Sequence, residues 1–247
     1  MEETVKIYGG NQVSSVKVNE AGIFYFAKEP YVYYQNLMIA GTRHTVDNLE
    51  SFTVLFSRVH SDGLVRIEET GEHLHPGDSM QVEQGKATLV AEAGTPRILI
   101  SGVKENVREP KGMTITRNGQ HYKVSKPWGY ELWFNRQHPG YSLKEVYIQS
   151  GHRTSLQYHN YKIETNILFM GRTLLDYQIE GEGELRSIML DPVTSMHVTP
   201  PVLHRLKSIE NTLLYETSTP HLDDVVRIED DNNRGHGRIQ HEHQGNQ

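Results

Sequence analysis

The sequence lacks cysteine altogether, although it contains 14 histidines among its 247 residues. Disulfide bonds, a thiolate nucleophile and a sulfur-rich metal site are therefore excluded. Any metal ion must be held by nitrogen and oxygen ligands.

The sequence also lacks a basic excess, since 25 lysines and arginines stand against 31 aspartates and glutamates, for a formal net charge of -6. Binding to a phosphate backbone normally needs the opposite balance, so we expect no nucleic acid partner. No apolar run approaches the roughly 18 residues that span a bilayer, and the acidic start Met1-Glu2-Glu3 does not resemble a secretory signal. We expect a soluble, cytoplasmic protein without a membrane partner.

Short apolar or alternating runs, which are typical of β-strands, recur along the whole chain. Examples are Phe52–Phe56, Leu143–Ile148 and Asn166–Met170. Turn-forming clusters such as Ser61-Asp62-Gly63 separate the runs, and helical periodicity nowhere persists beyond about two turns. The pattern predicts an all-β sandwich or barrel, because antiparallel sheets must close or cover their edges.

A polar stretch at Lys104–Ser125 divides the chain into two halves of similar strand density. We predict one β domain at residues 1–110, a linker and first strand at 111–125, and a second β domain at 126–231. Residues 232–247 contain glycines and histidines with almost no apolar residue except Ile239, so they are predicted to form a disordered tail.

Four polar residues in the second half have the character and spacing of metal ligands. Gln157 and His159 are two residues apart, which places both side chains on one face of a strand. Glu164 follows a short polar turn, where a returning strand would bring its carboxylate back to the same interior. His204 begins a later strand and supplies a second histidine.

These residues lie in segments that resemble the motifs of the cupin family. The segment from Gly151 to Gly171 resembles the first motif, with Gln157 where most members have a histidine, and Pro201-Val202-Leu203-His204 resembles the second. The C-terminal half is most similar to the cupin domain of type II phosphomannose isomerases. That similarity is carried by Lys126-Pro127-Trp128-Gly129, Ser155-Leu156-Gln157-Tyr158-His159 and the closing segment Asp223–Asp230.

The N-terminal half resembles a second, degenerate cupin, judged from its strand pattern and from the turn Leu74-His75-Pro76-Gly77-Asp78. His73 and His75 lack a matching glutamate, so we interpret them as part of a surface turn. The resemblance implies an all-β protein of two cupin barrels, also described as double-stranded β-helices or jelly rolls, with a degenerate N-terminal one. It also implies a homodimer, because bicupins commonly pair through edge strands.

The resemblance implies one divalent metal ion, held by the four polar residues: Gln157, His159, Glu164 and His204. Nitrogen and oxygen ligands suit Zn, Mn, Fe, Co or Ni, and Zn or Mn is favoured. Gln157 has an alternative role, in which it orients a water or a substrate hydroxyl.

The leading functional hypothesis is a metal-dependent aldose–ketose isomerase that acts on a sugar or sugar phosphate. In that chemistry a metal polarises the carbonyl and its neighbouring hydroxyl, while a base moves a proton between adjacent carbons through an enediolate. Lys144 and Glu164 are the predicted catalytic residues. The predicted substrate-binding residues are Lys162, Arg205, Glu216 and Arg227.

Other interpretations of the sequence stay open. Lys144 can instead be a solvated lysine on an edge strand, and Arg205 and Arg227 can instead form structural ion pairs. A cupin dioxygenase is an alternative function, although its usual ligand set is richer in histidine. A non-catalytic sugar-binding or regulatory bicupin is another, favoured by the degenerate N-terminal half.

Overall fold

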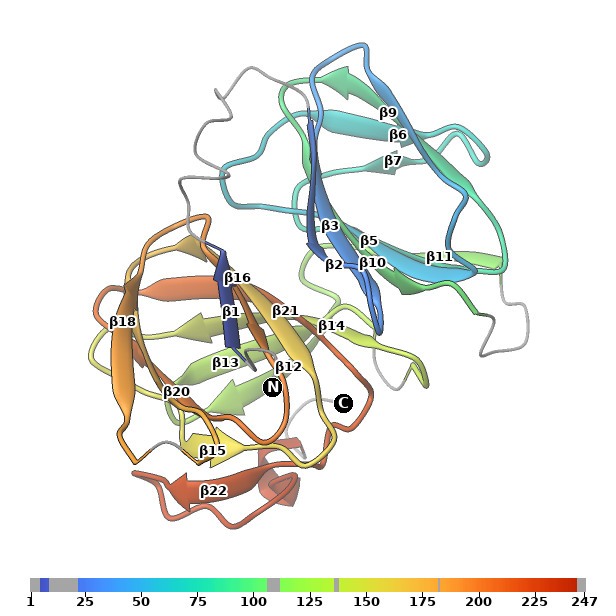
Figure 1. Ribbon diagram of the computed structural model, residues 1–247. Coiled ribbons are helices and arrows are strands. Elements are labelled where there is room, and N and C mark those ends of the chain that lie inside the picture. The colour runs from blue at the N-terminus through green and yellow to red at the C-terminus, as the bar shows by residue number, and fades with distance from the viewer. Residues whose placement is uncertain (1–4, 9–21, 106–111, 136–137, 182, 244–247) are drawn as a thin grey trace. The chain divides into compact units, whose positions relative to one another are not determined.

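A computed structural model describes residues 5–8, 22–105, 112–135, 138–181 and 183–243 of the chain (Figure 1). By its contacts the chain divides into two compact units. The N-terminal unit contains residues 14–121 and 134–143, and the C-terminal unit contains residues 1–13, 122–133 and 144–247. No helix within the described ranges is long and apolar enough to cross a membrane.

The N-terminal unit is built from two antiparallel sheets. Its strands are β2 (Gly22–Ala27), β3 (Val32–Leu37), β4 (Arg43–Val46), β5 (Ser51–Phe56), β6 (Leu64–Ile67), β7 (His73–Leu74), β8 (Ser79–Glu83), β9 (Ala87–Ala93), β10 (Arg97–Val103) and β11 (Gly112–Thr116). The larger sheet has the order β11-β8-β5-β10-β3-β2, and the smaller one has the order β4-β9-β6-β7.

The C-terminal unit repeats this two-sheet plan. Its strands are β1 (Val5–Tyr8), β12 (Tyr122–Lys126), β13 (Gly129–Trp133), β14 (Ser142–Ile148), β15 (Leu156–Tyr158), β16 (Glu164–Met170), β17 (Thr173–Gln178), β18 (Arg186–Leu190), β19 (Ser195–Val198), β20 (Leu203–Ser208), β21 (Thr212–Ser218) and β22 (Val226–Glu229). A 3-10 helix, η1 (Gln240–His243), follows. The sheet orders are β1-β19-β16-β21-β14-β13-β12 and β18-β17-β20-β15-β22. The two double-sheet units confirm the prediction of an all-β protein.

The interiors of the two units differ in chemistry. In the N-terminal unit, alternate residues of β5 such as Phe52, Val54 and Phe56 point into an apolar core. The C-terminal unit has a smaller apolar core and a group of buried charged side chains: Glu131, Lys144, Lys162, Glu164 and Glu216. Buried charges are costly unless they are paired, so the contacts among these side chains are described below.

Two segments lie in the opposite unit from the one that the sequence-based division gives them. Strand β1 pairs with β19 and extends a sheet of the C-terminal unit. Residues 134–143 belong to the N-terminal unit, where the Tyr141 and Thr53 hydroxyls lie 2.8 Å apart and Gln81 donates to the carbonyl of Phe134 at 2.7 Å. Pairing of this kind satisfies backbone groups at a sheet edge, but it joins distant parts of the chain and leaves no local pattern in the sequence.

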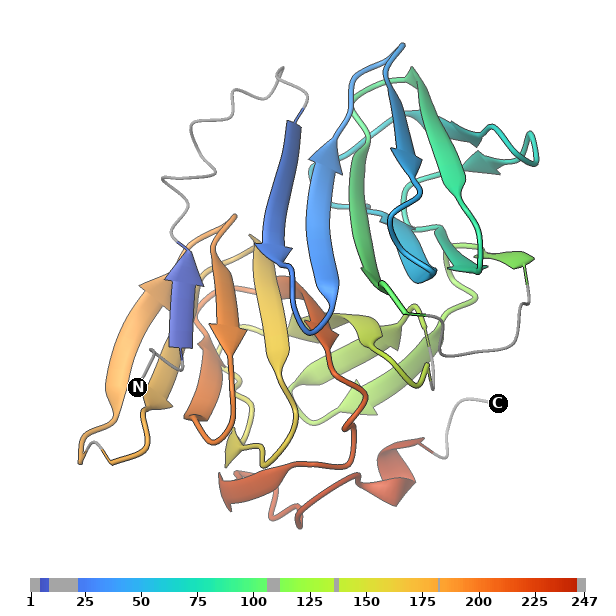
Figure 2. The ribbon, with the colours of Figure 1, turned by 45° about the vertical axis from the view of Figure 1, so that its right-hand side comes forward.

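The predicted disordered tail has a described path as far as His243 (Figure 2). Arg234 donates to Asp230 at 2.6 Å and lies 3.3 Å from Glu242, and all three side chains are buried. Lys126 of β12 reaches the same Glu242 at 2.8 Å. These buried ion pairs hold the segment, and the composition of residues 232–247 gives no sign of them.

Candidate metal centre

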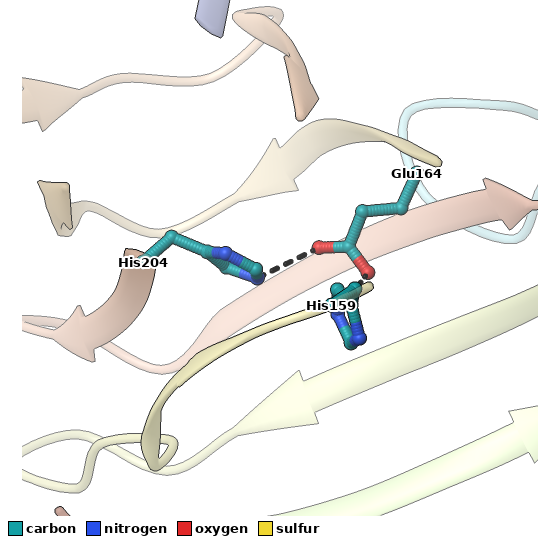
Figure 3. Close-up of side chains that lie close together, drawn as sticks. All are labelled: His159, Glu164 and His204. Carbon is teal, nitrogen blue, oxygen red and sulfur yellow. Dashed lines mark ion pairs between the residues drawn. The ribbon is translucent and has the colours of Figure 1, made fainter. Parts of the chain in front are cut away.

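Three of the predicted ligands converge in the interior of the C-terminal unit (Figure 3). His159 directly follows β15, Glu164 begins β16, and His204 lies in β20. The Nε2 atoms of His159 and His204 lie 3.6 and 3.2 Å from the two oxygens of the Glu164 carboxylate. One potential ligand atom from each residue lies within 4.8 Å of the others, so the three can contact a single ion.

Both imidazole rings are oriented by backbone carbonyls. His159 Nδ1 donates to the carbonyl of Asp224, and His204 Nδ1 donates to that of Val202 at 3.0 Å. A proton on Nδ1 leaves the lone pair of Nε2 directed at the centre, as in metal-binding histidines. Both Nε2 atoms are buried and make no hydrogen bond within the described part of the chain. Two such nitrogens facing one carboxylate fit a divalent cation.

The electrostatics of the three side chains also suit metal binding. Burial alone would raise the pKa of Glu164, but Lys162 and the two histidines outweigh it and hold that pKa well below its ordinary value. Burial lowers the pKa of His159, which favours the neutral ring. At His204 the attraction of Glu164 outweighs burial and raises the pKa, so metal binding there would displace a proton.

Gln157, the fourth predicted ligand, lies beside this centre. It pairs in register with His204 across β15 and β20 and lines the adjoining cavity. Its amide oxygen accepts a hydrogen bond of 2.7 Å from Ser155 Oγ. A carbonyl oxygen has a second lone pair, so this contact is compatible with either a ligand or an orienting role.

Asp224 organises the turn that joins β15 to β16. Its carboxylate accepts hydrogen bonds from the backbone N–H groups of Asn160, Tyr161 and Lys162 at 3.0, 2.6 and 2.9 Å. Burial opposes ionisation, but these hydrogen bonds prevail and lower the pKa of Asp224 to about 2. Because the carbonyl of Asp224 also orients His159, this one residue fixes both the turn and a metal ligand.

Replacing Asp224 with asparagine is expected to weaken Zn²⁺ and Mn²⁺ binding by about 10- to 100-fold, the usual effect of losing an outer-shell contact. An amide has only one acceptor oxygen, so the turn would lose part of its hydrogen bonding. The measurement is a metal titration against a chelating dye. The neighbouring variant Asp223→Asn is the matched control, because that exposed side chain pairs only with Arg238 in the described structure. Equal affinities in the two variants would contradict the positioning role of Asp224.

A cavity of about 120 Å³ adjoins the centre and is lined entirely by the C-terminal unit. Gln157, Glu164 and His204 form its metal-binding side. Charged side chains form much of the remaining wall: Lys126, Glu131, Lys144, Lys162, Glu216 and Arg227.

Lysines and carboxylates alternate along this wall. Lys162 Nζ lies 2.5 Å from Glu164 and 2.7 Å from Glu216. Lys144 Nζ lies 3.3 Å from the other oxygen of Glu216 and 3.0 Å from Glu131. Burial opposes the charge on Lys144, but Glu131 and Glu216 outweigh it and raise the pKa of Lys144. The lysine is therefore an ammonium group at neutral pH.

The structure brings most of the predicted substrate and catalytic residues to this cavity. Lys144, Lys162, Glu216 and Arg227 all line it. Arg205 does not, because its guanidinium donates to the carbonyl of Thr154 at 3.1 Å and to Glu229 at 3.1 Å. The sequence interpretation of Arg205 as part of an ion pair describes its position in the structure.

Sequence reasoning gave no role to five charged residues in or beside the cavity: Lys126, Glu131, Arg234, Arg238 and Glu242. Lys126 opens the Pro-Trp-Gly segment, but no role was assigned to it. Glu131 alternates with Gly129 and Trp133, and a lone charge at an inward strand position was the available signal. Glu242 lies in the polar tail, where composition alone carries no signal.

The described residues of the N-terminal unit form no comparable centre. Within the described ranges, His159, Glu164 and His204 are the only group of three or more histidine or acidic residues whose donor atoms converge in this way. His75 lies in a turn, and its side chain is 62% exposed.

No protein-family model matches the sequence, and no curated protein matches it. Solved structures do match. Streptomyces albus HEPD, with 2-hydroxyethylphosphonate and Fe(II) bound, has a TM-score of 0.65 at 9% identity over 87% of this chain and 76% of its own. Bacillus subtilis oxalate decarboxylase, which has Mn(II) centres, has a TM-score of 0.61 at 10% identity over 91% and 74%. The E. coli protein Ylba has a TM-score of 0.63 at 10% identity over 82% and 84%.

These three are cupin-fold proteins, and the chain has the same fold. The predicted pair of jelly-roll barrels is thereby confirmed. At this level of identity the similarity concerns the fold alone, so the narrower resemblance to type II phosphomannose isomerases stays a prediction.

Proposed function

We propose that the protein is a metal-dependent isomerase that interconverts aldose and ketose forms of a sugar or sugar phosphate. The supporting observation is that a cavity lined by Glu164 and His204 of the His-Glu-His group also contains the ion pairs of Lys144, Lys162 and Glu216. A metal centre on this fold suits many chemistries. Isomerisation additionally needs acid and base groups beside the metal, and the cavity contains them.

The contacts of each residue indicate its role in the reaction. A bound divalent ion would supply Lewis acidity to the substrate carbonyl and its neighbouring hydroxyl. Glu164 would hold the metal ion together with the two histidines, so we assign proton transfer to Glu216, which lines the same cavity. Its carboxylate takes a proton from one carbon and returns it to the next. The Lys144 ammonium donates a hydrogen bond to the oxygen on which negative charge develops.

The aromatic lining supports a polyhydroxylated substrate. Trp133 lines the cavity and its indole Nε1 is buried without a hydrogen-bond partner in the described structure. An indole N–H is a donor only, so it suits the oxygen of a substrate hydroxyl. The Lys144 ammonium lies 5.2 Å from the centre of the same ring, which keeps the lysine and the tryptophan on one side of the cavity.

The direct test is isomerisation in D₂O with the metal-loaded full-length chain and a panel of aldoses and their phosphates. Metal-dependent deuterium incorporation at a carbon next to the carbonyl is the expected result, because an enediolate is reprotonated from an exchangeable group. Glu216→Gln should lower kcat by at least about 100-fold with unchanged metal content. Glu210→Gln, an exposed substitution outside the cavity, should not.

The same experiment can reject the proposal. Binding of a sugar to the metal-loaded protein without exchange of carbon-bound hydrogen would indicate a binding module. Substrate-dependent oxygen consumption by the Fe(II)-loaded protein would indicate a dioxygenase, the chemistry that redox-active iron supports in this class of site.

A further inference from the structure

A second set of charges lies at the edge of the cavity to which residues 234–243 contribute part of the wall. Lys126 and Arg234 both line the cavity. The Glu242 carboxylate joins them, with one oxygen 2.8 Å from Lys126 Nζ and the other 3.3 Å from Arg234 Nη1. The Glu242 side chain is only 5% exposed, so an internal carboxylate occupies a buried site between two cations.

Arg227 adds a third cation. Its Nη1 donates to the carbonyls of Gly235 and Gly237, but its Nε is buried without a hydrogen-bond partner in the described residues. Burial and the repulsion from Arg234 lower the pKa of Arg227, against the attraction of Asp230, Glu242 and Glu131. An anion between them would relieve this repulsion and satisfy the free donor.

The other cations of the cavity are already neutralised. Lys162 is held by Glu164 and Glu216, and Lys144 is held by Glu216 and Glu131. An anion placed beside them would meet carboxylates at short range. Lys126 and Arg234 also have other acidic partners, Glu131 at 3.6 Å and Asp230 at 2.6 Å, so they stay paired when Glu242 is exchanged for an anion.

The size of the cavity indicates that a bound substrate would displace Glu242. Its 120 Å³ is below the roughly 300–1,000 Å³ that is usual for small-molecule sites. Residues 234–243 supply part of the wall, through Arg234, Gly237, Arg238, Ile239 and His243. A sugar-sized ligand therefore needs η1 (Gln240–His243) to move outward, and that movement separates Glu242 from Lys126 and from Arg234, which Asp230 holds in place.

We propose that Lys126, Arg227 and Arg234 form the subsite for an anionic group of the substrate, either a phosphate monoester or a carboxylate. Glu242 occupies this subsite in the free protein and is displaced when the anion binds. The inference rests on the proposed function, since it assigns the anionic end of the isomerised sugar to the edge of the cavity formed by the C-terminal segment.

The test is calorimetric titration of the full-length protein with inorganic phosphate and, separately, with acetate. Glu242→Gln removes the competing charge and keeps the side-chain shape, so it should tighten binding of the matching anion by at least about 10-fold, as expected for a charged hydrogen-bond partner. Glu210→Gln, which removes one charge from an exposed turn, should leave affinity unchanged. Tighter binding of phosphate would indicate a phosphate monoester as substrate, and tighter binding of acetate would indicate a carboxylate.

Loss of binding is tested at Lys126, because replacing Arg234 would leave the buried Asp230 unpaired and risk misfolding. Lys126→Gln should weaken anion binding by at least about 10-fold, and Lys126→Arg should retain it. The inference is overturned if Glu242→Gln and Glu210→Gln bind both anions like the unaltered protein, or if neither anion binds any of them.

The readout separates this inference from the proposed function, because it measures binding and requires no turnover. Tighter phosphate binding in Glu242→Gln without isomerase activity would uphold the subsite and reject the isomerase. Isomerisation of neutral sugars by a protein that binds neither anion would uphold the isomerase and reject the subsite.

Discussion

The full-length His204→Ala protein is expected to lose stoichiometric metal, with affinity for Zn²⁺ and Mn²⁺ falling by more than about 100-fold. Loss of a contact that orients a metal ligand already lowers metal affinity by about 10- to 100-fold. Removal of a ligand itself should lower the affinity further. His204 Nε2 lies 3.2 Å from Glu164, and no other imidazole except that of His159 converges on this carboxylate in the described structure. Elemental analysis after dialysis, followed by metal titration, measures the effect.

The matched control is His152→Ala. His152 lies in the same unit, is exposed, and its ring makes one contact of 3.2 Å with the carbonyl of Ser150. It should keep its metal, which separates the centre from adventitious binding by histidines. The C-terminal histidines should stay in place during this comparison, because the segment that carries them also carries Glu242. Stoichiometric metal in His204→Ala would reject the centre.

The metal-free Lys162→Met protein is expected to be less stable by about 3–5 kcal/mol, the usual cost of leaving buried charges without a partner. Lys162 Nζ contacts both Glu164 and Glu216, and all three side chains are buried. Methionine fills a similar volume but leaves Glu164 without an ammonium partner and Glu216 paired with Lys144 alone. Urea unfolding of the metal-free protein gives the free energy, and added Zn²⁺ should recover part of it by supplying a cation to Glu164.

Two further variants make this result specific. Lys207→Met replaces an exposed lysine on β20 and should change the free energy of unfolding by less than about 0.5 kcal/mol. The double variant Lys162→Met, Glu216→Gln should be more stable than Lys162→Met alone, because one uncompensated charge is gone. A Lys162→Met protein as stable as the Lys207→Met protein would show that the buried network does not depend on Lys162.

The proximity of His159 and Glu164 was predictable because it is encoded locally, whereas His204 was assigned through the resemblance to the second cupin motif. The spacing of Gln157 and His159 follows strand parity, and the short turn before Glu164 returns the chain to the same interior. The adjoining ion pairs were only partly predictable. Lys144 and Glu131 meet because β13 pairs with β14, and strand register depends on the whole sheet rather than on neighbouring residues.

The order of the C-terminal segment, residues 232–243, could not be predicted from its own composition. Its glycines and histidines have the composition of a disordered tail, and composition describes what a segment can bury by itself. Arg234 and Glu242 are held by charges from elsewhere, namely Asp230 and Lys126. A segment that gains its order from distant partners cannot be recognised from its own residues.

Because β1 pairs with β19, it stays unpaired until most of the chain has been synthesised. Val5 pairs with Val198, about 190 positions later. At a translation rate of about 5–20 residues per second, β1 waits roughly 10–40 s for its partner to leave the ribosome. During that interval its backbone groups are open to other strands, including those of neighbouring nascent chains. Strand β1 can therefore join its sheet only after β19 has been synthesised.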